Sequence, residues 1–320
     1  MTPSLYIQQQ LNSLAVIPPV SLTESGVEKN IYTLLLSKKF RKYSVNPEYM
    51  DHIRSAIALN VSRNTPIKLT LVFGGYKLWR LQESPEPDWA EVFSLMYYAN
   101  WLAPIAAIYK PGVIMDFYSD DVILESMDNI PKNDTERYII GFRSLLAFMK
   151  KYIPKNLSFT LNRVGDQYRS YKDFVIELEQ SIVDAKKVLG GLPTLTPEQA
   201  GLVELNVRVK PGQIDDPKWK EKVFLIHEGY SRVSKRRPYY RTPDKIFVIT
   251  RPLKDSIAVG TTKTSVVKFW VGAGVLKTQG DSFMPYVFSP KQLSVGSFRT
   301  EDIQVNGLTG KNYTSVRILV

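Results

Sequence analysis

The sequence predicts an α/β protein with a largely parallel, Rossmann-like sheet and helices on both faces, followed by a β-rich, basic C-terminal part. Three observations predict this class. Between residues 67 and 189, apolar runs of strand length alternate with longer runs of helical periodicity, as is typical of parallel sheets. Beyond residue 204, short β-branched runs follow one another between Gly, Pro and Asp. The length of 320 residues and the apolar content of 44% suit one large globular unit or two joined units.

The chain divides by pattern into an N-terminal helical segment, an α/β core and a basic, β-rich part packed on the core, over residues 1–60, 61–204 and 205–320. The first part begins with a peripheral helical stretch and ends in a short amphipathic helix over residues 48–60. A stretch marked by Pro and Gly over residues 190–217 is the one plausible boundary between the other two parts.

Three strand–helix pairs build the predicted core. The strands are expected over residues 67–73, 113–118 and 157–161, and the helices from 88 to about 109, from 133 to about 152 and from 174 to 189. Asp88 with Glu91 has the spacing of a capping box, which explains both residues as helix caps rather than catalysts. Pro104 is expected to kink or end the first of these helices.

The C-terminal part differs from the core in pattern and in charge. Strands are expected there over residues 244–251, 265–271, 283–288 and 314–320, either continuing the same sheet or forming a small second layer. The net charge of +11 arises wholly in this part, because residues 1–204 hold 22 Lys+Arg and 22 Asp+Glu, whereas residues 205–320 hold 20 and 9. The densest basic run spans residues 232–241. Such a field attracts nucleic acid, acidic lipid or a phosphorylated metabolite, or it is simply a soluble basic surface.

Composition excludes several classes of site. Cysteine is absent, so disulfides, Cys-based zinc sites and a cysteine nucleophile are excluded. The only histidines are His52 and His227, of which His227 is an acid–base candidate, although a lone histidine is more often structural. No apolar run approaches the ~20 residues that span a bilayer, and no signal-peptide pattern begins the chain. We therefore expect a cytoplasmic protein without membrane contact.

Polar residues follow each of the three predicted strands, at the edge where parallel sheets bind ligands. They are Gly74, Gly75, Tyr76 and Lys77 after the first strand, Ser119, Asp120 and Asp121 after the second, and Arg163 and Asp166 after the third. The glycine pair either lets the backbone approach an anion, with Lys77 adding a charge, or makes an ordinary turn. Asp120 and Asp121 bind a divalent cation, supply a base, or lie in a surface turn.

The order of short motifs along the chain resembles a known family. FGGYK at 73–77, PDWAE at 87–91, YKPG at 109–112 and FYSDD at 117–121 are followed by YSRVS at 230–234 and FWVGAGVL at 269–276. In this order they resemble the pyoverdine/dityrosine biosynthesis family, which contains the isonitrile synthases. The resemblance covers roughly residues 65–150 and 228–282.

The resemblance implies an enzyme that joins the amine of tyrosine or tryptophan to a carbon taken from ribulose 5-phosphate. The product would be an isonitrile or, as in some members, an N-formyl compound, and no metal or organic cofactor is expected. The implied catalytic residues are Lys77, Asp120 and Asp121, and the implied substrate-binding residues are Gly74, Gly75, Tyr76, Arg232, Ser234, Arg236 and Trp270. Independently of the family, guanidinium groups in a basic C-terminal part suit the phosphate of a sugar phosphate.

The sequence also departs from the family pattern. Asp121 replaces the glycine of the family's S-D-G motif, and Arg236 and Val271 stand where the family has histidines. The fold is then kept while the reaction has changed or been lost. One alternative is a non-catalytic basic binding protein on the same fold, with nucleic acid as its partner, because tyrosines and cations of residues 230–241 suit base stacking and phosphate. Another is a magnesium-dependent transferase using Asp116, Asp120 and Asp121.

Overall fold

Five parallel strands form the central sheet, and they confirm the predicted fold class. Their order across the sheet is β3-β2-β1-β4-β5. The strands are β1 (Ile67–Phe73), β2 (Val113–Ser119), β3 (Leu157–Arg163), β4 (Lys245–Ile249) and β5 (Ile257–Ala258). The first three pair along their whole length, with Ile67 opposite Val113 and Val113 opposite Leu157. The three strands predicted for the core are therefore confirmed in position.

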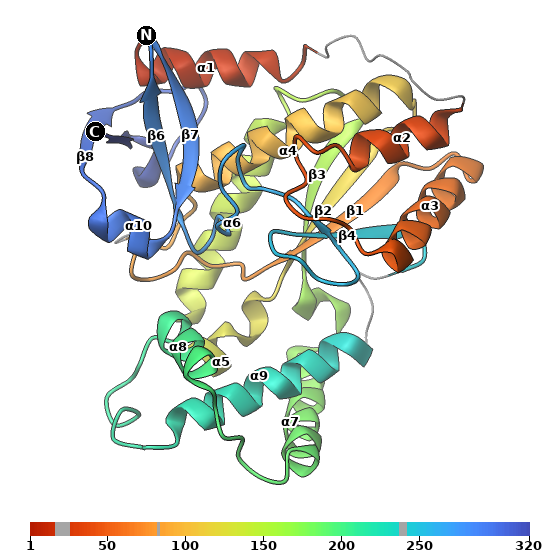
Figure 1. The fold of residues 1–320 in the computed structure, drawn as a ribbon. Helices are drawn as coiled ribbons and strands as arrows, with labels where there is room; N and C mark the ends of the chain where they lie inside the picture. Colours follow the sequence, from red (N-terminus) through yellow and green to blue (C-terminus); the bar gives the residue numbers. More distant parts are fainter. Residues whose placement is uncertain (17–25, 82–83, 237–241) are drawn as a thin grey trace.

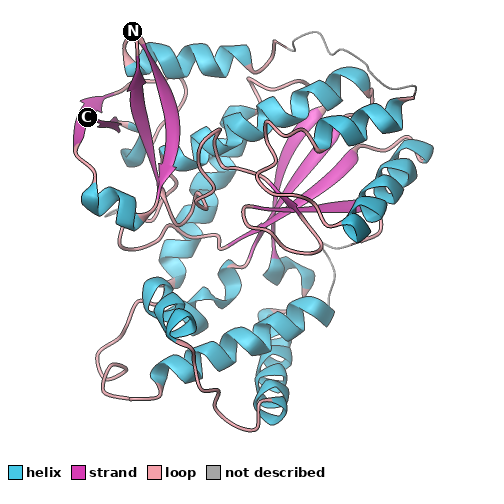
Figure 2. Ribbon diagram, in the orientation of Figure 1, coloured by secondary structure: helices cyan, strands magenta, loops and turns pink. Residues whose placement is uncertain are grey.

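The computed structural model describes residues 1–16, 26–81, 84–236 and 242–320, with the backbone alone for residues 234–236. Figures 1 and 2 show the central sheet flanked by helices, a second sheet at one side and a group of helices below the main body. Both chain ends lie beside the second sheet (Figure 1). None of the helices within the described ranges combines the length and apolar character needed to cross a membrane.

Two long helices connect the first three strands. They are α4 (Trp89–Ile108) between β1 and β2, and α6 (Lys132–Met149) between β2 and β3. Right-handed crossovers place both helices on one face of the sheet. The predicted capping box is present, because Asp88 accepts a hydrogen bond from the Ala90 amide at 2.7 Å and Glu91 accepts one from the Asp88 amide at 2.8 Å. Pro104 does not end α4, which continues to Ile108.

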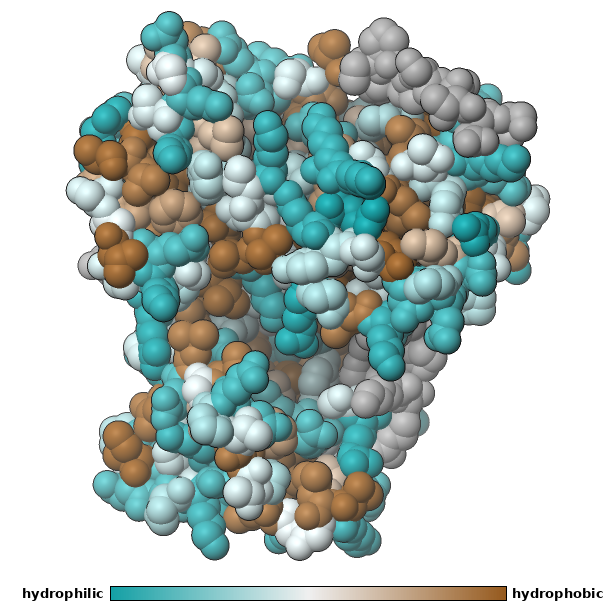
Figure 3. All heavy atoms as spheres, viewed as in Figure 1, coloured by the Kyte–Doolittle hydropathy of each residue, from teal (hydrophilic) through white to brown (hydrophobic). Residues whose placement is uncertain are grey.

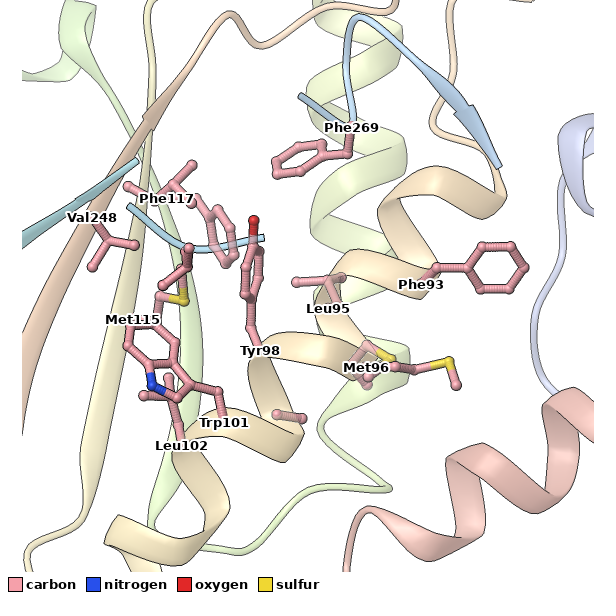
Figure 4. Close-up of a cluster of buried hydrophobic side chains, with 14 of the residues drawn as sticks. Phe93, Leu95, Met96, Tyr98, Trp101, Leu102, Met115, Phe117, Val248 and Phe269 are labelled. Carbon is pink, nitrogen blue, oxygen red and sulfur yellow. The ribbon is translucent and has the colours of Figure 1, made fainter. Parts of the chain in front are cut away.

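The core lies between these helices and the sheet. α4 is apolar on almost every side and is buried over most of its length, so it is a core helix rather than a surface helix. In Figure 4, the Tyr98 ring of α4 lies between Leu95 and Phe117, and its hydroxyl oxygen points toward Phe269. That hydroxyl is buried and has no hydrogen-bond partner among the described residues. The same holds for the hydroxyl groups of Thr70 in β1 and Ser94 in α4, so the core contains several unsatisfied polar atoms.

Three helices precede the sheet, which agrees with the predicted helical segment. They are α1 (Pro3–Ser13), α2 (Val27–Leu35) and α3 (Pro47–Ser62). α1 packs on β7 of the second sheet, α2 packs on α3 and α4, and α3 packs on β1 and β4. The Tyr49 hydroxyl of α3 accepts a hydrogen bond from the Phe247 amide of β4 at 2.6 Å, which ties this helix to the sheet.

The C-terminal part contains both of the predicted arrangements, since β4 and β5 extend the main sheet and four further strands form a second layer. These are β6 (Ala273–Gln279), β7 (Ser282–Phe288), β8 (Phe298–Asp302) and β9 (Ser315–Leu319), in the order β7-β6-β9-β8, with the short helix α10 (Pro290–Val295) after β7. The strand predicted over 265–271 was wrong. The amides of Val271 and Gly272 donate to the Lys268 carbonyl, and this turn buries Phe269 and Trp270.

A helical subdomain, which we define as α5, α7, α8 and α9, lies beyond the main body (Figure 1). These helices are α5 (Leu124–Asp128), α7 (Tyr171–Val188), α8 (Pro197–Asn206) and α9 (Trp219–Arg236). Short 3-10 turns at Asp121–Ile123, Val164–Gln167 and Lys311–Tyr313 complete the fold. α7 packs against α9 around a small apolar cluster that includes Phe174 and Val233. The sequence predicted α7 but neither α8 nor α9.

Candidate functional site

The candidate site lies at the carboxyl edge of the parallel sheet. The chain builds the sheet outward from β1 to β2 and β3, and then places β4 on the other side of β1, so the order reverses between β1 and β4. Ligands of open parallel sheets bind in the crevice that such a reversal leaves beyond the strand ends. Figure 3 shows the surface hollowed between the α/β body and the helical subdomain.

The loop after β1 packs closely against the end of β2. Gly75 has a φ of +71°, and a Cβ atom there would lie 1.9 Å from Ser119 Oγ, so a larger residue meets both a strained backbone and a clash. A Cβ atom at Gly74 would lie 3.0 Å from the indole Nε1 of Trp270 and 2.4 Å from the Tyr76 ring. The structure therefore brings Gly74, Tyr76 and Trp270 together and sets Gly75 against Ser119; their binding of substrate stays a prediction.

Lys77 lies inside the protein, with 1% of its side chain exposed. Its ammonium group donates to Asp88 Oδ1 at 2.8 Å, Glu91 Oε2 at 2.9 Å and the Phe269 carbonyl at 2.9 Å, which uses its three donors. Tyr138 donates to Glu91 Oε1 at 3.0 Å; burial raises the pKa of Glu91, and the charge of Lys77 opposes this rise. We predicted a lysine facing the substrate, whereas these contacts make Lys77 the counter-charge of the helix cap.

Asp121 is held by a closed set of partners. It accepts a hydrogen bond from Ser119 Oγ at 2.5 Å and forms an ion pair with Arg163 of β3, which also bonds Glu136 at 2.7 Å. Burial raises the pKa of Asp121, and the hydrogen bond from Arg163 opposes the rise. These contacts join the end of β2 to the end of β3, so the surroundings of Asp121 are those of a structural carboxylate.

Asp120 has a more open environment. Its amide donates to the Phe73 carbonyl at 3.0 Å, and its half-buried carboxyl group accepts a hydrogen bond from the Tyr230 hydroxyl of α9 at 2.5 Å. Burial raises the pKa of Asp120 to about 7; the Tyr230 hydrogen bond opposes this rise and the charge of Asp121 adds to it. A carboxyl group that titrates near neutrality is suited to general acid–base chemistry; the catalytic role of Asp120 stays a prediction.

Lys268 is the functional candidate that sequence reasoning missed. It stands beside Trp270, with Nζ 5.3 Å from the indole centroid. Burial lowers the pKa of Lys268 to about 8; the charge of Arg251 lowers it further, and the charge of Asp120 opposes the shift. Within the described ranges, Nζ forms neither a hydrogen bond nor an ion pair. The available signal is a single lysine inside the apolar run 265–271, which the pattern predicts as a strand.

Helix α9 brings polar side chains of the helical subdomain to this edge. Tyr230 reaches Asp120, and His227, one turn earlier on the same face, lies 3.1 Å from Asp128 Oδ1. Arg232 has a buried Nε that finds no hydrogen-bond partner in the part of the chain that the structure describes. Sequence analysis named Arg232 and His227, but it did not predict the helix that carries both together with Tyr230.

Part of the basic run lies outside the described residues. This applies to the side chains of Ser234 and Arg236, which we predicted in the site, and to residues 237–241. Of the two side chains of the run that the structure describes, Arg232 is half-buried and Val233 is fully buried. The alternative of a nucleic-acid surface stays a prediction.

A cavity of about 260 Å³ opens on the other side of Tyr76. Its lining consists of aromatic, charged and small polar residues: Tyr76, Lys77, Trp79, Ser84, Pro85, Ile130, Asp134, Arg137 and Arg208. Burial raises the pKa of Tyr76, and the charge of Asp128 adds to the rise, so its phenol stays protonated at neutral pH. Tyr76 thus belongs both to this cavity and to the contact with Gly74.

The alternative magnesium site is not formed. In the described part of the chain, no group of three or more His, Cys, Asp or Glu side chains is arranged to hold a metal ion. Asp116 accepts hydrogen bonds from Thr160 and Asn162 and lies 3.7 Å from Lys245 Nζ, so it is occupied by its own neighbours. Its predicted partners Asp120 and Asp121 have the separate environments described above.

The fold and this edge together define an α/β protein of the doubly wound class with a candidate active site at its topological switch point. Among solved structures, the chain is similar to the PvcA protein from Pseudomonas aeruginosa, with a TM-score of 0.62 and 16% sequence identity over 92% of this chain and 100% of that one. No family model matches the chain, and no curated protein matches it in sequence. The likeness to PvcA shows a shared fold.

Proposed function

We propose that this chain is an isonitrile-synthase-like enzyme that couples the amine of an aromatic amino acid with a phosphorylated ketose of the ribulose 5-phosphate class. The observation that carries the proposal is the gathering of an amine, a carboxyl group and a guanidinium group, those of Lys268, Asp120 and Arg251, at the switch point of a fold similar to that of PvcA. The order of motifs over residues 65–150 and 228–282 supports the same reaction class.

The proposed roles follow from the surroundings of each group. Asp120 takes a proton from the substrate ammonium group, because its own pKa of about 7 lets it hold or release a proton near neutral pH. Trp270 and Tyr76 flank the aromatic ring of the amino acid. Arg251 at the end of β4 is exposed, and Arg232 has an unpaired Nε, so both suit the phosphate group.

The missing family histidines do not by themselves exclude this chemistry. A proton carrier needs a pKa near the working pH rather than an imidazole ring. Asp120 has a pKa of about 7 and Lys268 has a pKa of about 8, so both groups exchange protons near physiological pH. The two groups also sense each other's charge, since Lys268 lowers the pKa of Asp120 and Asp120 raises that of Lys268.

The proposal is tested by incubating the protein with tyrosine or tryptophan and uniformly carbon-13-labelled ribulose 5-phosphate, followed by mass spectrometry. We expect a product that carries one labelled carbon on the amino-acid nitrogen. Asp120→Asn should slow its formation by about 10²–10⁴-fold, as loss of a general base does. Asp281→Asn, which changes an exposed carboxylate in the turn between β6 and β7, is the matched control and should keep the rate. Absence of labelled product together with no calorimetric binding of ribulose 5-phosphate would overturn the proposal.

A further inference from the structure

Three cations lie near the carboxyl edge with very different surroundings. Lys77 donates to two carboxylates and a carbonyl, and Arg163 is bound between Asp121 and Glu136. Lys268 is half-buried beside Trp270, and it has no carboxylate within ion-pair distance in the described residues. A buried ammonium group without a counter-charge is destabilised relative to the free amine. Lys268 is therefore the lysine at this edge that the structure prepares to react rather than to pair.

The backbone fixes where the Lys268 amine stands. Its carbonyl accepts hydrogen bonds from the Val271 amide at 3.0 Å and the Gly272 amide at 2.9 Å, so the residue heads a tight turn. The same turn sets Trp270 against the Phe73 ring, with centroids 5.7 Å apart, and leaves Nζ 5.3 Å from the indole centroid. The amine is thus held by a rigid aromatic contact at the end of β1.

A carboxyl group accompanies this amine. Asp120 stands at the end of β2, and its amide is bonded to the carbonyl of Phe73, the last residue of β1, at 3.0 Å. Tyr230 of α9 donates to Asp120 at 2.5 Å and acts as its positioning residue. An amine that attacks a carbonyl compound needs an adjacent acid–base group to move protons, and Asp120 supplies one.

We propose that Lys268 is a catalytic residue that forms a covalent imine with the carbonyl carbon of a phosphorylated ketose. This inference rests on the proposed function for the identity of the ketose. The free amine of Lys268 attacks the carbonyl carbon to form a carbinolamine, and Asp120 donates a proton to the departing oxygen. A carbon–nitrogen double bond forms and one water leaves, so the step needs no oxidant or reductant. The amine of the amino acid then replaces Lys268 on the same carbon and releases the free lysine.

The surrounding charge selects a phosphorylated carbonyl compound over a neutral one. Arg251 is exposed at the end of β4 and acts on Lys268 through its charge. Arg232 of α9 has a buried Nε that lacks an acceptor in the described residues. A phosphate group gives Arg232 a hydrogen-bond acceptor and Arg251 a counter-charge. Its negative charge also stabilises the protonated imine that forms on Lys268.

The free-amine form of Lys268 also depends on pH. Burial lowers its pKa from the ordinary value of 10.5 to about 8; of the two charged groups that act on it, Arg251 adds to the fall and Asp120 opposes it. At pH 7.5 this lowering increases the fraction of free amine by about 100-fold or more. Imine formation should accordingly rise with pH up to about 8 and level off above it.

The test is reductive trapping on the full-length protein. The protein is mixed with ribulose 5-phosphate and sodium borohydride, digested, and analysed by peptide mass spectrometry. We expect the sugar phosphate on the peptide that contains Lys268. Lys268→Arg, which keeps the charge and removes the nucleophile, should reduce trapping by more than about tenfold. Lys263→Arg, which changes an exposed lysine of the same loop, should trap normally. Circular dichroism and melting temperature check that each variant is folded.

A second carbonyl compound separates failure of this inference from failure of the proposed function. Pyridoxal 5′-phosphate, a phosphorylated aldehyde, is used as the probe in the same protocol. Trapping of the probe on Lys268 without trapping of ribulose 5-phosphate supports the reactive amine and overturns the choice of ketose. Labelled product formed at the normal rate by Lys268→Arg overturns the imine while the proposed function stands. No adduct on Lys268 with either compound overturns this inference outright.

Discussion

Replacing Lys77 with methionine should destabilise the protein severely. Its ammonium group lies 2.8 Å from Asp88 and 2.9 Å from Glu91, with 1% of the lysine side chain and 5% and 0% of the two acidic side chains exposed. Methionine fills the space but leaves both carboxylates buried without a counter-charge. Breaking a buried ion pair from one side costs about 3–5 kcal/mol. Since a domain is stable by about 5–15 kcal/mol, Lys77→Met should lose a large share of the total.

The loss should come from the uncompensated charge rather than from lost packing. Lys77→Met combined with Glu91→Gln should therefore recover part of the stability, because an amide at position 91 needs no counter-charge. Lys68→Met is the matched control. Lys68 pairs with Asp244 at 2.6 Å, but 31% of the lysine side chain is exposed, so its loss should cost about 1 kcal/mol.

The assay is urea unfolding of the four proteins at neutral pH, followed by fluorescence and circular dichroism. A loss of less than about 1 kcal/mol in Lys77→Met would refute the reasoning, because it would mean that the two carboxylates tolerate burial alone. Equal losses for Lys77→Met and the double variant would refute the attribution to charge. Either result would reopen the prediction that Lys77 contacts substrate.

Two further predictions concern buried groups. In the wild type, the folded state keeps the Asp120 proton up to a pKa of about 7, whereas the unfolded chain loses it near 3.8. The unfolding free energy therefore falls as pH rises from about 4 to 7. Asp120→Asn removes this titrating group and should flatten the pH dependence of stability in that range. Urea titrations across that range check the sign, and equal slopes for the two proteins would contradict it. Tyr98→Phe removes a buried hydroxyl that has no partner, so the unfolding free energy should stay unchanged or rise by about 1 kcal/mol. A clear drop in its melting temperature would show that the hydroxyl is satisfied.

The core was predictable because its signals are local and agree with one another. Each of β1, β2 and β3 is a short apolar run followed by a helix with a clear start, and the Asp88 capping box marks the beginning of α4 within the printed sequence. The strand predicted over 265–271 was wrong because the same apolar residues serve a turn equally well. There, Phe269 and Trp270 are buried by tertiary packing that β propensity does not encode.

The site was predictable only in outline. The strand ends could be placed from the order of elements, and Asp120, Gly74 and Trp270 do meet there. The sequence does not reveal which charged side chains form ion pairs in the folded protein. Lys77 stands 11 and 14 residues before its acidic partners Asp88 and Glu91, and nothing in that spacing shows that all three are buried together. The capping reading of the two carboxylates was confirmed, but their second function, as partners of a buried lysine, needed the structure.

Burial alone therefore does not distinguish structural from reactive charges at this edge; the arrangement of partners does. Lys77 is fully buried and Lys268 is half-buried beside the Phe269–Trp270 turn; the first meets two carboxylates, and the second meets only a distant carboxyl and a repelling arginine. The paired lysine stabilises the fold through its ion pairs with Asp88 and Glu91. The unpaired one releases its proton near neutral pH, and its desolvation is a cost that the fold carries. An unpaired lysine does not stabilise the fold, so folding gives no reason for this desolvation cost. The simplest reason for the cost is a bound substrate whose phosphate and carbonyl carbon supply the missing partners of Lys268.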